Sequence, residues 1–190
     1  MDPHQVYQEV AEHVKADTPI TADTLAKLPY LKAFVKETFR LWPNGTEVSR
    51  YCEQVTRSPT SCPPTPSYSQ DLVLSDHHIP AGTHLDLNPS VHFKDPDLFP
   101  DPEVHSPERW LRDGAGSTVH PYILTPFGHG TRMCAGRRFA EQDLYVLLAR
   151  VVHRFHLSYS SPPEMGQTYH TLLWPDRPLE VRFVDRQKGQ

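Results

Sequence analysis

A ten-residue stretch around Cys134 constrains this chain more than any other part of its sequence. It reads Phe-Gly-His-Gly-Thr-Arg-Met-Cys-Ala-Gly over residues 127–136. From Arg137 to about Phe155, apolar residues then recur near helical spacing, which predicts a helix. Cys134 therefore precedes a helix N-terminus, where unpaired N–H groups and the helix dipole favour a thiolate over a thiol. Neighbouring glycines allow turns that a Cβ forbids, and they let a flat ligand approach the backbone.

This stretch resembles the haem-binding loop of the cytochrome P450s, whose pattern is F-x-x-G-x-R-x-C-x-G. The matching residues are Phe127, Gly130, Arg132, Cys134 and Gly136, with Gly128 in the same loop. An ordinary buried cysteine is the alternative, but the match at every fixed position argues against it. The resemblance implies that Cys134 ligates haem iron, that Arg132 pairs with a haem propionate and that Phe127 packs beside the sulfur. A thiolate ligand favours O–O cleavage and hence monooxygenation.

Two further motifs follow the order that the family shows along the chain. Glu37 and Arg40 stand three apart on a helix predicted from about Pro29 to Trp42, and alone they would be an ordinary helical ion pair. Pro-Glu-Arg-Trp at 107–110 comes next, and the cysteine stretch comes last. The resemblance implies a buried ionic network of Glu37, Arg40 and Arg109. We interpret this network as holding the fold together and not as catalytic.

Basic residues on the predicted helix suggest a partner. Lys32 and Lys36 lie one helical turn apart, and their segment resembles the mitochondrial clan of the family, in which two basic residues at these places dock an acidic ferredoxin. Arg137 and Arg138, directly after the cysteine loop, would extend the same positive patch. The alternative is a solvated basic face whose lysine stems cover apolar surface.

The resemblance also implies a substrate pocket. Its predicted wall residues are Asn44, Glu47, Val48, Leu172 and Leu173. Arg50 matches a position that meets a haem propionate. Glu47 either hydrogen-bonds a substrate hydroxyl or faces water, and the rarity of unpaired buried carboxylates favours water.

Periodicity and turn signals predict the remaining elements. Two are helices, at about 2–14 and, in a short form, 89–93. A linker is expected at 17–23, and a Ser/Thr/Pro-rich insertion, where the family has a tight turn, at 56–70. Strands are expected at 48–55, 155–160, 168–174 and 179–184, and a hairpin joins 71–79 to 83–87 around residues 80–82.

Composition excludes some classes of protein. A net charge of −4 gives no nucleic-acid footprint. No apolar run approaches the ~18 residues of a membrane-spanning helix. Three cysteines, at 52, 62 and 134, form neither a disulfide framework nor a metal-binding spacing. Twelve histidines are scattered without a metal motif, and His129 in the cysteine loop is a loop residue and not an iron ligand in our interpretation.

The sequence is therefore identified as the C-terminal part of a single P450 domain, an α+β and mainly helical fold. By resemblance, residues 1–190 contain the end of helix J, helices K and L, small sheets and the cysteine loop. The family's central helix, with the acid/alcohol pair that delivers protons to bound oxygen, is expected upstream. We therefore expect a fragment, whose activity alone is doubtful.

The expected parent enzyme is a haem-thiolate monooxygenase that uses O₂ and electrons from a ferredoxin on a lipophilic, steroid- or sterol-like substrate. By resemblance it is mitochondrial, on the inner membrane, and membrane-associated. One alternative is a partner-independent peroxygenase or isomerase with the same haem-thiolate chemistry. The other is a non-catalytic fold fragment that acts only as a binding piece.

Overall fold

The computed structural model describes residues 3–45, 48–51, 71–111, 119–159, 165–170 and 172–186. Two compact units emerge, and each is described by itself. The larger unit combines Met1–Thr46 with Pro89–Gln190, and the smaller unit is Glu47–Asn88. The predicted insertion at 56–70 lies outside the described residues, and the single-domain assignment stays a prediction.

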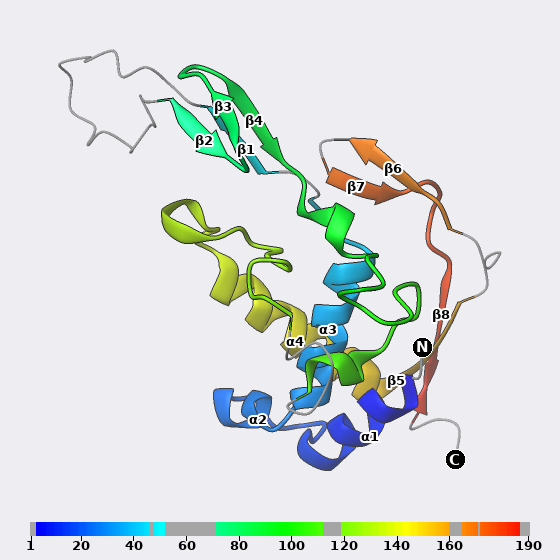
Figure 1. Ribbon diagram of the computed structural model, residues 1–190. Coiled ribbons are helices and arrows are strands. Elements are labelled where there is room, and N and C mark those ends of the chain that lie inside the picture. The colour runs from blue at the N-terminus through cyan, green and yellow to red at the C-terminus, as the bar shows by residue number, and fades with distance from the viewer. Residues whose placement is uncertain are drawn as a thin grey trace. The chain divides into compact units, whose positions relative to one another are not determined.

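Helices dominate the larger unit (Figure 1). Their bounds are α1 Pro3–His13, α2 Ala22–Ala26, α3 Pro29–Leu41 and α4 Arg137–Arg154. The predictions of α1, α3 and α4 are confirmed, but α2 begins inside the segment expected to be a linker. Thr21 is the N-cap of α2, because its side chain accepts a hydrogen bond from the backbone N–H of Thr24 at 3.3 Å. A capping threonine followed by Asp23 is a helix-start signal that the sequence analysis missed.

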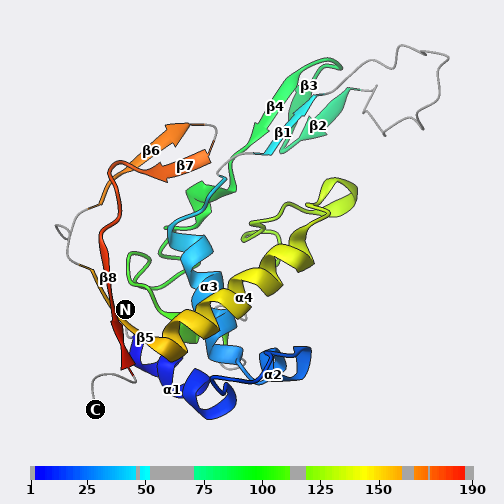
Figure 2. The ribbon, with the colours of Figure 1, turned by 180° about the vertical axis from the view of Figure 1, so that it is seen from behind.

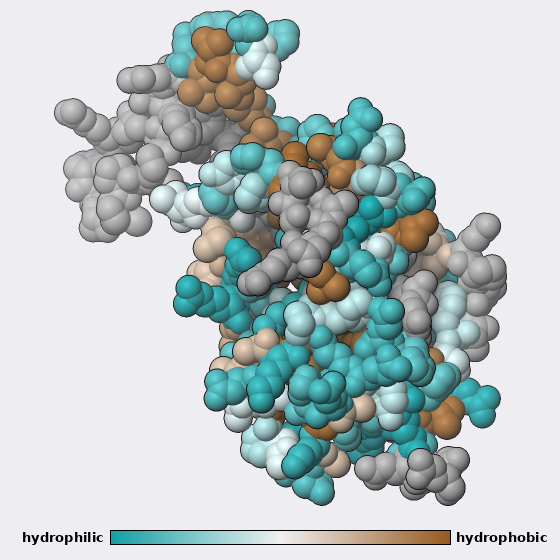
Figure 3. All heavy atoms as spheres, turned by 60° about the horizontal axis from the view of Figure 1, so that its bottom comes forward, coloured by the Kyte–Doolittle hydropathy of each residue, from teal (hydrophilic) through white to brown (hydrophobic). Residues whose placement is uncertain are grey.

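The core lies where α1, α3 and α4 meet. It combines buried side chains from these helices, from α2 and from the residues that flank α1 and α3: Val6, Val10, Val14, Leu25, Leu28, Leu31 and Ala149. Figure 2 shows α4 crossing α3 over this core. The face of the molecule over α1 and α2 is largely hydrophilic (Figure 3), as expected when an amphipathic helix turns its valines inward.

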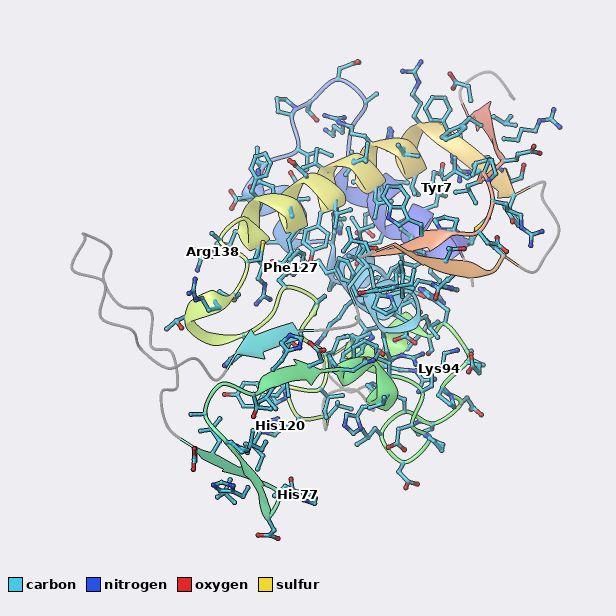
Figure 4. The ribbon with its side chains drawn as sticks, turned by 90° about the horizontal axis from the view of Figure 1, so that it is seen from above. Tyr7, His77, Lys94, His120, Phe127 and Arg138 are labelled. Atoms are coloured by element: carbon cyan, nitrogen blue, oxygen red, sulfur yellow. The ribbon has the colours of Figure 1, made fainter. Side chains whose placement is uncertain are left out.

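Side chains from other elements tie the helix ends together. Glu9 on α1 accepts hydrogen bonds from the backbone N–H groups of Tyr30 and Leu31, at 2.8 and 2.9 Å. It thereby caps α3, whose own N-cap residue, Leu28, makes no side-chain cap. Near the C-terminal end of α4, the Arg186 guanidinium lies 3.7 Å from the ring centroid of Tyr7. Figure 4 labels Tyr7 at this end of the helix.

Two antiparallel sheets of two strands each complete the described part of the larger unit. In the first, β5 (Phe155–Tyr159) pairs with β8 (Val181–Asp185). In the second, β6 (Gln167–His170) pairs with β7 (Leu172–Pro175). The single strand expected at 168–174 is therefore wrong: this segment turns back on itself. Pairing its two halves satisfies backbone N–H and C=O groups that one isolated strand would leave without partners.

In the described part of the chain, three short 3₁₀ helices connect these elements: η1 Pro89–His92, η2 Pro107–Trp110 and η4 Gly130–Arg132. The first corresponds to the short helix expected at 89–93. The second carries the Pro-Glu-Arg-Trp motif, and its proline sits at the start of the turn, where a missing N–H costs no hydrogen bond. The third lies inside the cysteine stretch.

Strands alone make up the described part of the smaller unit. β1 (Val48–Tyr51) pairs with β4 (His84–Leu87), and β2 (Leu72–Leu74) pairs with β3 (His77–Ile79). The predicted hairpin between 71–79 and 83–87 is therefore wrong. The tight turn lies at Ser75 and Asp76, whose φ angles of 46° and 64° are left-handed. Two such residues in succession suit a two-residue hairpin loop, but Ser-Asp is a weak sequence signal for one.

Candidate functional site

The backbone around Cys134 is held on both sides by hydrogen bonds. Its N–H donates to the carbonyl of Phe127 at 2.8 Å, and its own carbonyl accepts from the N–H of Arg137 at 3.2 Å. The first bond closes the loop across seven residues, and the second joins the cysteine to the first residue of α4. As predicted, the cysteine stands directly before a helix N-terminus.

Two of the loop glycines adopt a backbone conformation that other residues rarely take. Gly128 and Gly130 have φ angles of 73° and 74°. Around Gly130 an added Cβ would meet no atom within 4 Å, so only backbone conformation demands glycine there. Gly136 is different: its φ is −84°, and an added Cβ would lie 3.9 Å from Cys134 Sγ. At that position the backbone does not require glycine, but a bare Cα leaves one side of the sulfur uncovered.

The thiol of Cys134 is exposed and forms no disulfide with any other described residue. It borders a pocket of about 520 Å³ that Met133, Arg137, Arg138 and Glu141 also line. An accessible sulfur with an uncovered Gly136 beside it suits a flat cofactor that carries a thiolate-seeking metal. No group of three or more His, Cys, Asp or Glu residues that could hold a metal by itself occurs among the described residues.

Phe127 and Arg132 occupy different surroundings. The Phe127 ring packs edge-to-face on Phe39 of α3, with centroids 5.5 Å apart, and it anchors the loop to that helix. Arg132 ends η4 and is exposed. Figure 4 shows Phe127 and Arg138 at the same end of α4, opposite the end near Tyr7.

Glu37, Arg40 and Arg109 lie together in the interior. Glu37 is 0% exposed, Arg40 1% and Arg109 8%. Arg40 grips the carboxylate with two hydrogen bonds, Nε to Oε2 at 3.0 Å and Nη2 to Oε1 at 2.8 Å. Arg109 Nε lies 3.3 Å from Oε1 as an ion pair without a hydrogen bond. The structure thus brings together the three residues that the motifs suggested.

Backbone carbonyls from distant loops accept further hydrogen bonds from the two guanidiniums. Arg40 donates to the carbonyls of Phe93, Pro102 and Val104. Arg109 Nη2 donates to the carbonyl of Asp101 at 2.9 Å. These bonds fasten the loop of residues 93–104 to α3, because a buried guanidinium must find acceptors for its N–H groups.

Sequence reasoning missed two further donors to Glu37. The Ser106 N–H reaches Oε1 at 3.1 Å, and the Trp110 indole Nε1 reaches Oε2 at 2.8 Å. Burial by itself raises the pKa of Glu37, but the hydrogen bonds from Arg40, Ser106 and Trp110 outweigh it and hold the pKa below its ordinary value. Glu37 therefore stays ionised, and no sequence signal identified the two extra donors.

Two residues of the predicted basic patch already contact other side chains of the protein. Lys36 Nζ lies 4.0 Å from the ring centroid of Trp110. Burial there, and secondly the positive charge of Arg137, lower the pKa of Lys36. Arg137 pairs with Glu141 at 3.0 Å. The basic residues of α3 and α4 thus influence one another, and Arg137 already has an acidic partner. Lys32 is half-buried on α3, and Arg138 is exposed.

Of the predicted pocket-wall residues, two are in contact. The Leu173 N–H donates to the carbonyl of Asn44 at 2.8 Å, which links β7 to the end of α3. Leu172 is 48% exposed. Glu47 and the side chains of Val48 and Arg50 lie outside the described residues.

Comparisons with known proteins agree on one family. The family model described as Cytochrome P450 matches residues 3–183. "Cytochrome P450 10" of Lymnaea stagnalis is 37% identical over 187 residues, 96% of this chain and 31% of that protein. "Cholesterol side-chain cleavage enzyme, mitochondrial" of Hypanus americanus is 33% identical over 160 residues, 84% of this chain and 27% of that protein.

A solved structure, retinoic acid bound cyanobacterial CYP120A1, matches with a TM-score of 0.80 and 27% sequence identity. The match covers 96% of this chain and 38% of that one. The chain thus spans less than a third of the length of these two curated relatives and somewhat more of the solved structure.

Proposed function

This chain belongs to the cytochrome P450 family, and on that premise we propose that Cys134 is the thiolate ligand of a haem iron. The family and its fold use cysteine-ligated haem. The observation that carries the proposal is the exposed Cys134 sulfur, held at the start of α4 by hydrogen bonds to Phe127 and Arg137. Arg132, exposed on the same loop, would meet a haem propionate. Gly136 would leave room for the porphyrin beside the sulfur, and Gly128 and Gly130 would shape the cofactor-binding loop through their positive φ angles.

The protein that contains this chain is a monooxygenase in our proposal. When bound, haem supplies the activation of O₂, and the chain supplies the ligand, its orientation and its electrostatic surroundings. Backbone hydrogen bonds on both sides of Cys134 hold the main chain from which the sulfur projects, so that the loop needs little reorganisation when the metal binds. The buried network of Glu37, Arg40 and Arg109 stabilises the fold and does not touch the sulfur-bearing loop through any hydrogen bond described above.

The proposed substrate is lipophilic and steroid- or sterol-like. Support comes from the two matches whose names mention cholesterol and retinoic acid, both of them apolar molecules with few polar groups. Leu172 and Leu173 would contribute to the apolar wall of its pocket, and the bond between Leu173 and Asn44 would hold that hairpin in position. Glu47 and Val48 remain predicted wall residues.

The proposed electron donor is an acidic ferredoxin, and the proposed location is the mitochondrion. Several relatives carry the word mitochondrial in their names. Lys32 and Lys36 on α3, with Arg137 and Arg138 on α4, would form the positive surface that steers the donor. Among the described residues, no helix is both long and apolar enough to cross a bilayer.

The test uses the full-length protein loaded with haem. Its reduced carbon-monoxide complex should show the absorption band typical of thiolate ligation, and Cys134→Ser should abolish that band and substrate oxidation together. A band that survives in Cys134→Ser would overturn the assignment of the ligand. Turnover should require ferredoxin and its reductase and should fall with added salt.

Two other outcomes would each favour one of the alternative functions. Turnover with peroxide that ignores ferredoxin and salt would favour the partner-independent peroxygenase or isomerase. A full-length protein that never incorporates haem would favour the binding-only alternative.

A further inference from the structure

We propose that Glu141 is a built-in competitor at the ferredoxin-docking surface: it occupies Arg137, and an acidic partner must displace it to dock. This inference rests on the proposed function, because it concerns the same partner. The sequence predicted only basic residues on this surface, and the inference adds one carboxylate to them. It assigns that carboxylate a role in setting how fast, and how selectively, an acidic protein associates.

The first step is the geometry of the pair. Arg137 and Glu141 stand one turn apart at the start of α4, and Arg137 Nε donates to Glu141 Oε1 at 3.0 Å. Their side chains are 47% and 25% exposed. On the other side, Arg137 Nη1 lies 3.9 Å from the sulfur of Met133. The guanidinium is thus folded back on its own helix and loop, and a partner meets it already engaged.

The second step is that the cations form one surface. Arg137 is close enough to Lys36 to lower the pKa of that lysine, after the larger effect of burial. Arg137 also lies 6.0 Å from the ring of Phe127, which packs on α3. Arg138 lines the same pocket as Arg137 and Glu141. Since like charges gathered in this way repel one another, a carboxylate placed among them is stabilised, whether it comes from Glu141 or from a partner.

The third step is that the pair is weak enough to exchange. Exposed pairs spaced i,i+4 shift an equilibrium by only about twofold. A partner carboxylate can therefore replace Glu141 at little cost. The negative charge of Glu141 nevertheless opposes the approach of an acidic protein, because encounter rates depend on the field of the whole surface. Glu141 should lower the association rate more than it alters the stability of the docked complex.

The experiment measures the association rate of full-length, haem-loaded protein with an acidic [2Fe–2S] ferredoxin by stopped flow, at low and high salt. Glu141→Gln should associate about three to ten times faster than wild type at ~50 mM salt, and the two should converge at ~500 mM. Arg137→Gln should associate more slowly than wild type. In the Arg137→Gln background, Glu141→Gln should produce a much smaller gain, because its target is gone.

Glu103→Gln is the matched control. It removes the carboxylate of another exposed ion pair, with Lys94 at 3.1 Å, and changes the net charge by the same amount. Lys94 lies across the molecule from Arg138 (Figure 4). The association rate of Glu103→Gln should stay close to that of wild type. The reduced carbon-monoxide spectrum of every variant should match wild type, which verifies that the cysteine loop is intact.

The outcomes separate the two proposals. If wild type itself shows no salt-dependent association with ferredoxin, the proposed partner is wrong and the inference is overturned with it. If wild type associates but Glu141→Gln is no faster, the partner stands and the role of Glu141 is wrong. An equal gain with and without Arg137, or in Glu103→Gln, would mean a general charge effect and would also overturn it.

Discussion

The indole Nε1 of Trp110 donates a 2.8 Å hydrogen bond to Oε2 of Glu37, although the two residues lie 73 positions apart in the sequence. The face of the same ring lies 4.0 Å from the ammonium of Lys36. One rigid side chain thus contacts a fully buried carboxylate along its edge and a cation on its face. The ionic network that holds the fold is in direct contact with the surface proposed to bind a partner.

Glu37→Gln should destabilise the full-length protein by about 3–5 kcal/mol. Glutamine keeps the size of the side chain but leaves Arg40 and Arg109 buried without a negative charge. Urea unfolding at neutral pH measures the effect. The matched control is Glu103→Gln, which breaks only the exposed pair with Lys94 and should change the free energy of unfolding by no more than about 0.5 kcal/mol. A loss below about 1 kcal/mol for Glu37→Gln would mean that the network is not structural.

Trp110→Phe should cost about 1–2 kcal/mol, because it keeps an aromatic ring and removes one donor to a buried carboxylate. The loss should grow as the pH rises through the acidic range, since only the ionised form of Glu37 needs that donor. The folded pKa of Glu37 is depressed, so its contribution is present above the unfolded value of 4.5 and is lost as the pH falls through the folded pKa. Trp174→Phe, at a ring that is 57% exposed, is the control and should leave stability nearly unchanged. Equal losses in both variants would contradict this explanation.

His105→Phe should make stability less dependent on pH between about pH 7.5 and pH 5. The Thr38 hydroxyl donates to the Phe34 carbonyl, so His105 Nε2 donates to Thr38, and its buried Nδ1 is an acceptor that finds no partner among the described residues. Burial lowers the pKa of His105. Its contribution is therefore complete above the unfolded value of 6.5 and is lost as the pH falls through the folded pKa.

At about pH 7.5 the same variant should differ from wild type by less than about 1 kcal/mol, because the lost contact with Thr38 is offset by removing an unsatisfied nitrogen. Thermal unfolding across the pH range measures both effects. A variant whose pH profile runs parallel to that of wild type would exclude His105 as the titrating group.

Gly130→Ala and Gly136→Ala should separate the needs of the backbone from those of a ligand. Gly130 has a φ of 74°, so alanine there should cost about 1–2 kcal/mol through strain alone. Gly136 has an ordinary φ and would place its Cβ at van der Waals distance from Cys134 Sγ. Gly136→Ala should therefore leave the stability of the haem-free protein unchanged and lower its haem occupancy. Haem titration and unfolding of the haem-free protein measure the two effects; unchanged occupancy in Gly136→Ala would argue against a porphyrin beside that residue.

Local patterns predicted the elements that depend on local physics. Val6, Val10 and Val14 recur at helical spacing, and all three are buried, the last of them directly after α1. The proline-initiated helix that carries Glu37 and Arg40, and the helix after the cysteine, begin where the sequence indicates. In contrast, Ser75 and Asp76 form a left-handed turn that their identities only weakly favour. The partner of β4 is β1, which precedes it by more than thirty residues. The sequence of either strand alone does not predict a pairing over such a distance.

By itself, the sequence determined α1, α3 and α4, the order of the three motifs and the loop that presents Cys134, because these depend on neighbours within a few residues. Only the tertiary structure decided which groups complete the Glu37 network and which ring the Lys36 ammonium contacts. It also decided that one buried nitrogen of His105 has no partner among the described residues. Ser106, Trp110 and the carbonyls of Phe93 and Pro102 reach that interior from segments far along the chain. Buried polar groups form hydrogen bonds with the groups that packing brings close to them. The hydrophobic periodicity of the sequence does not predict which groups those are.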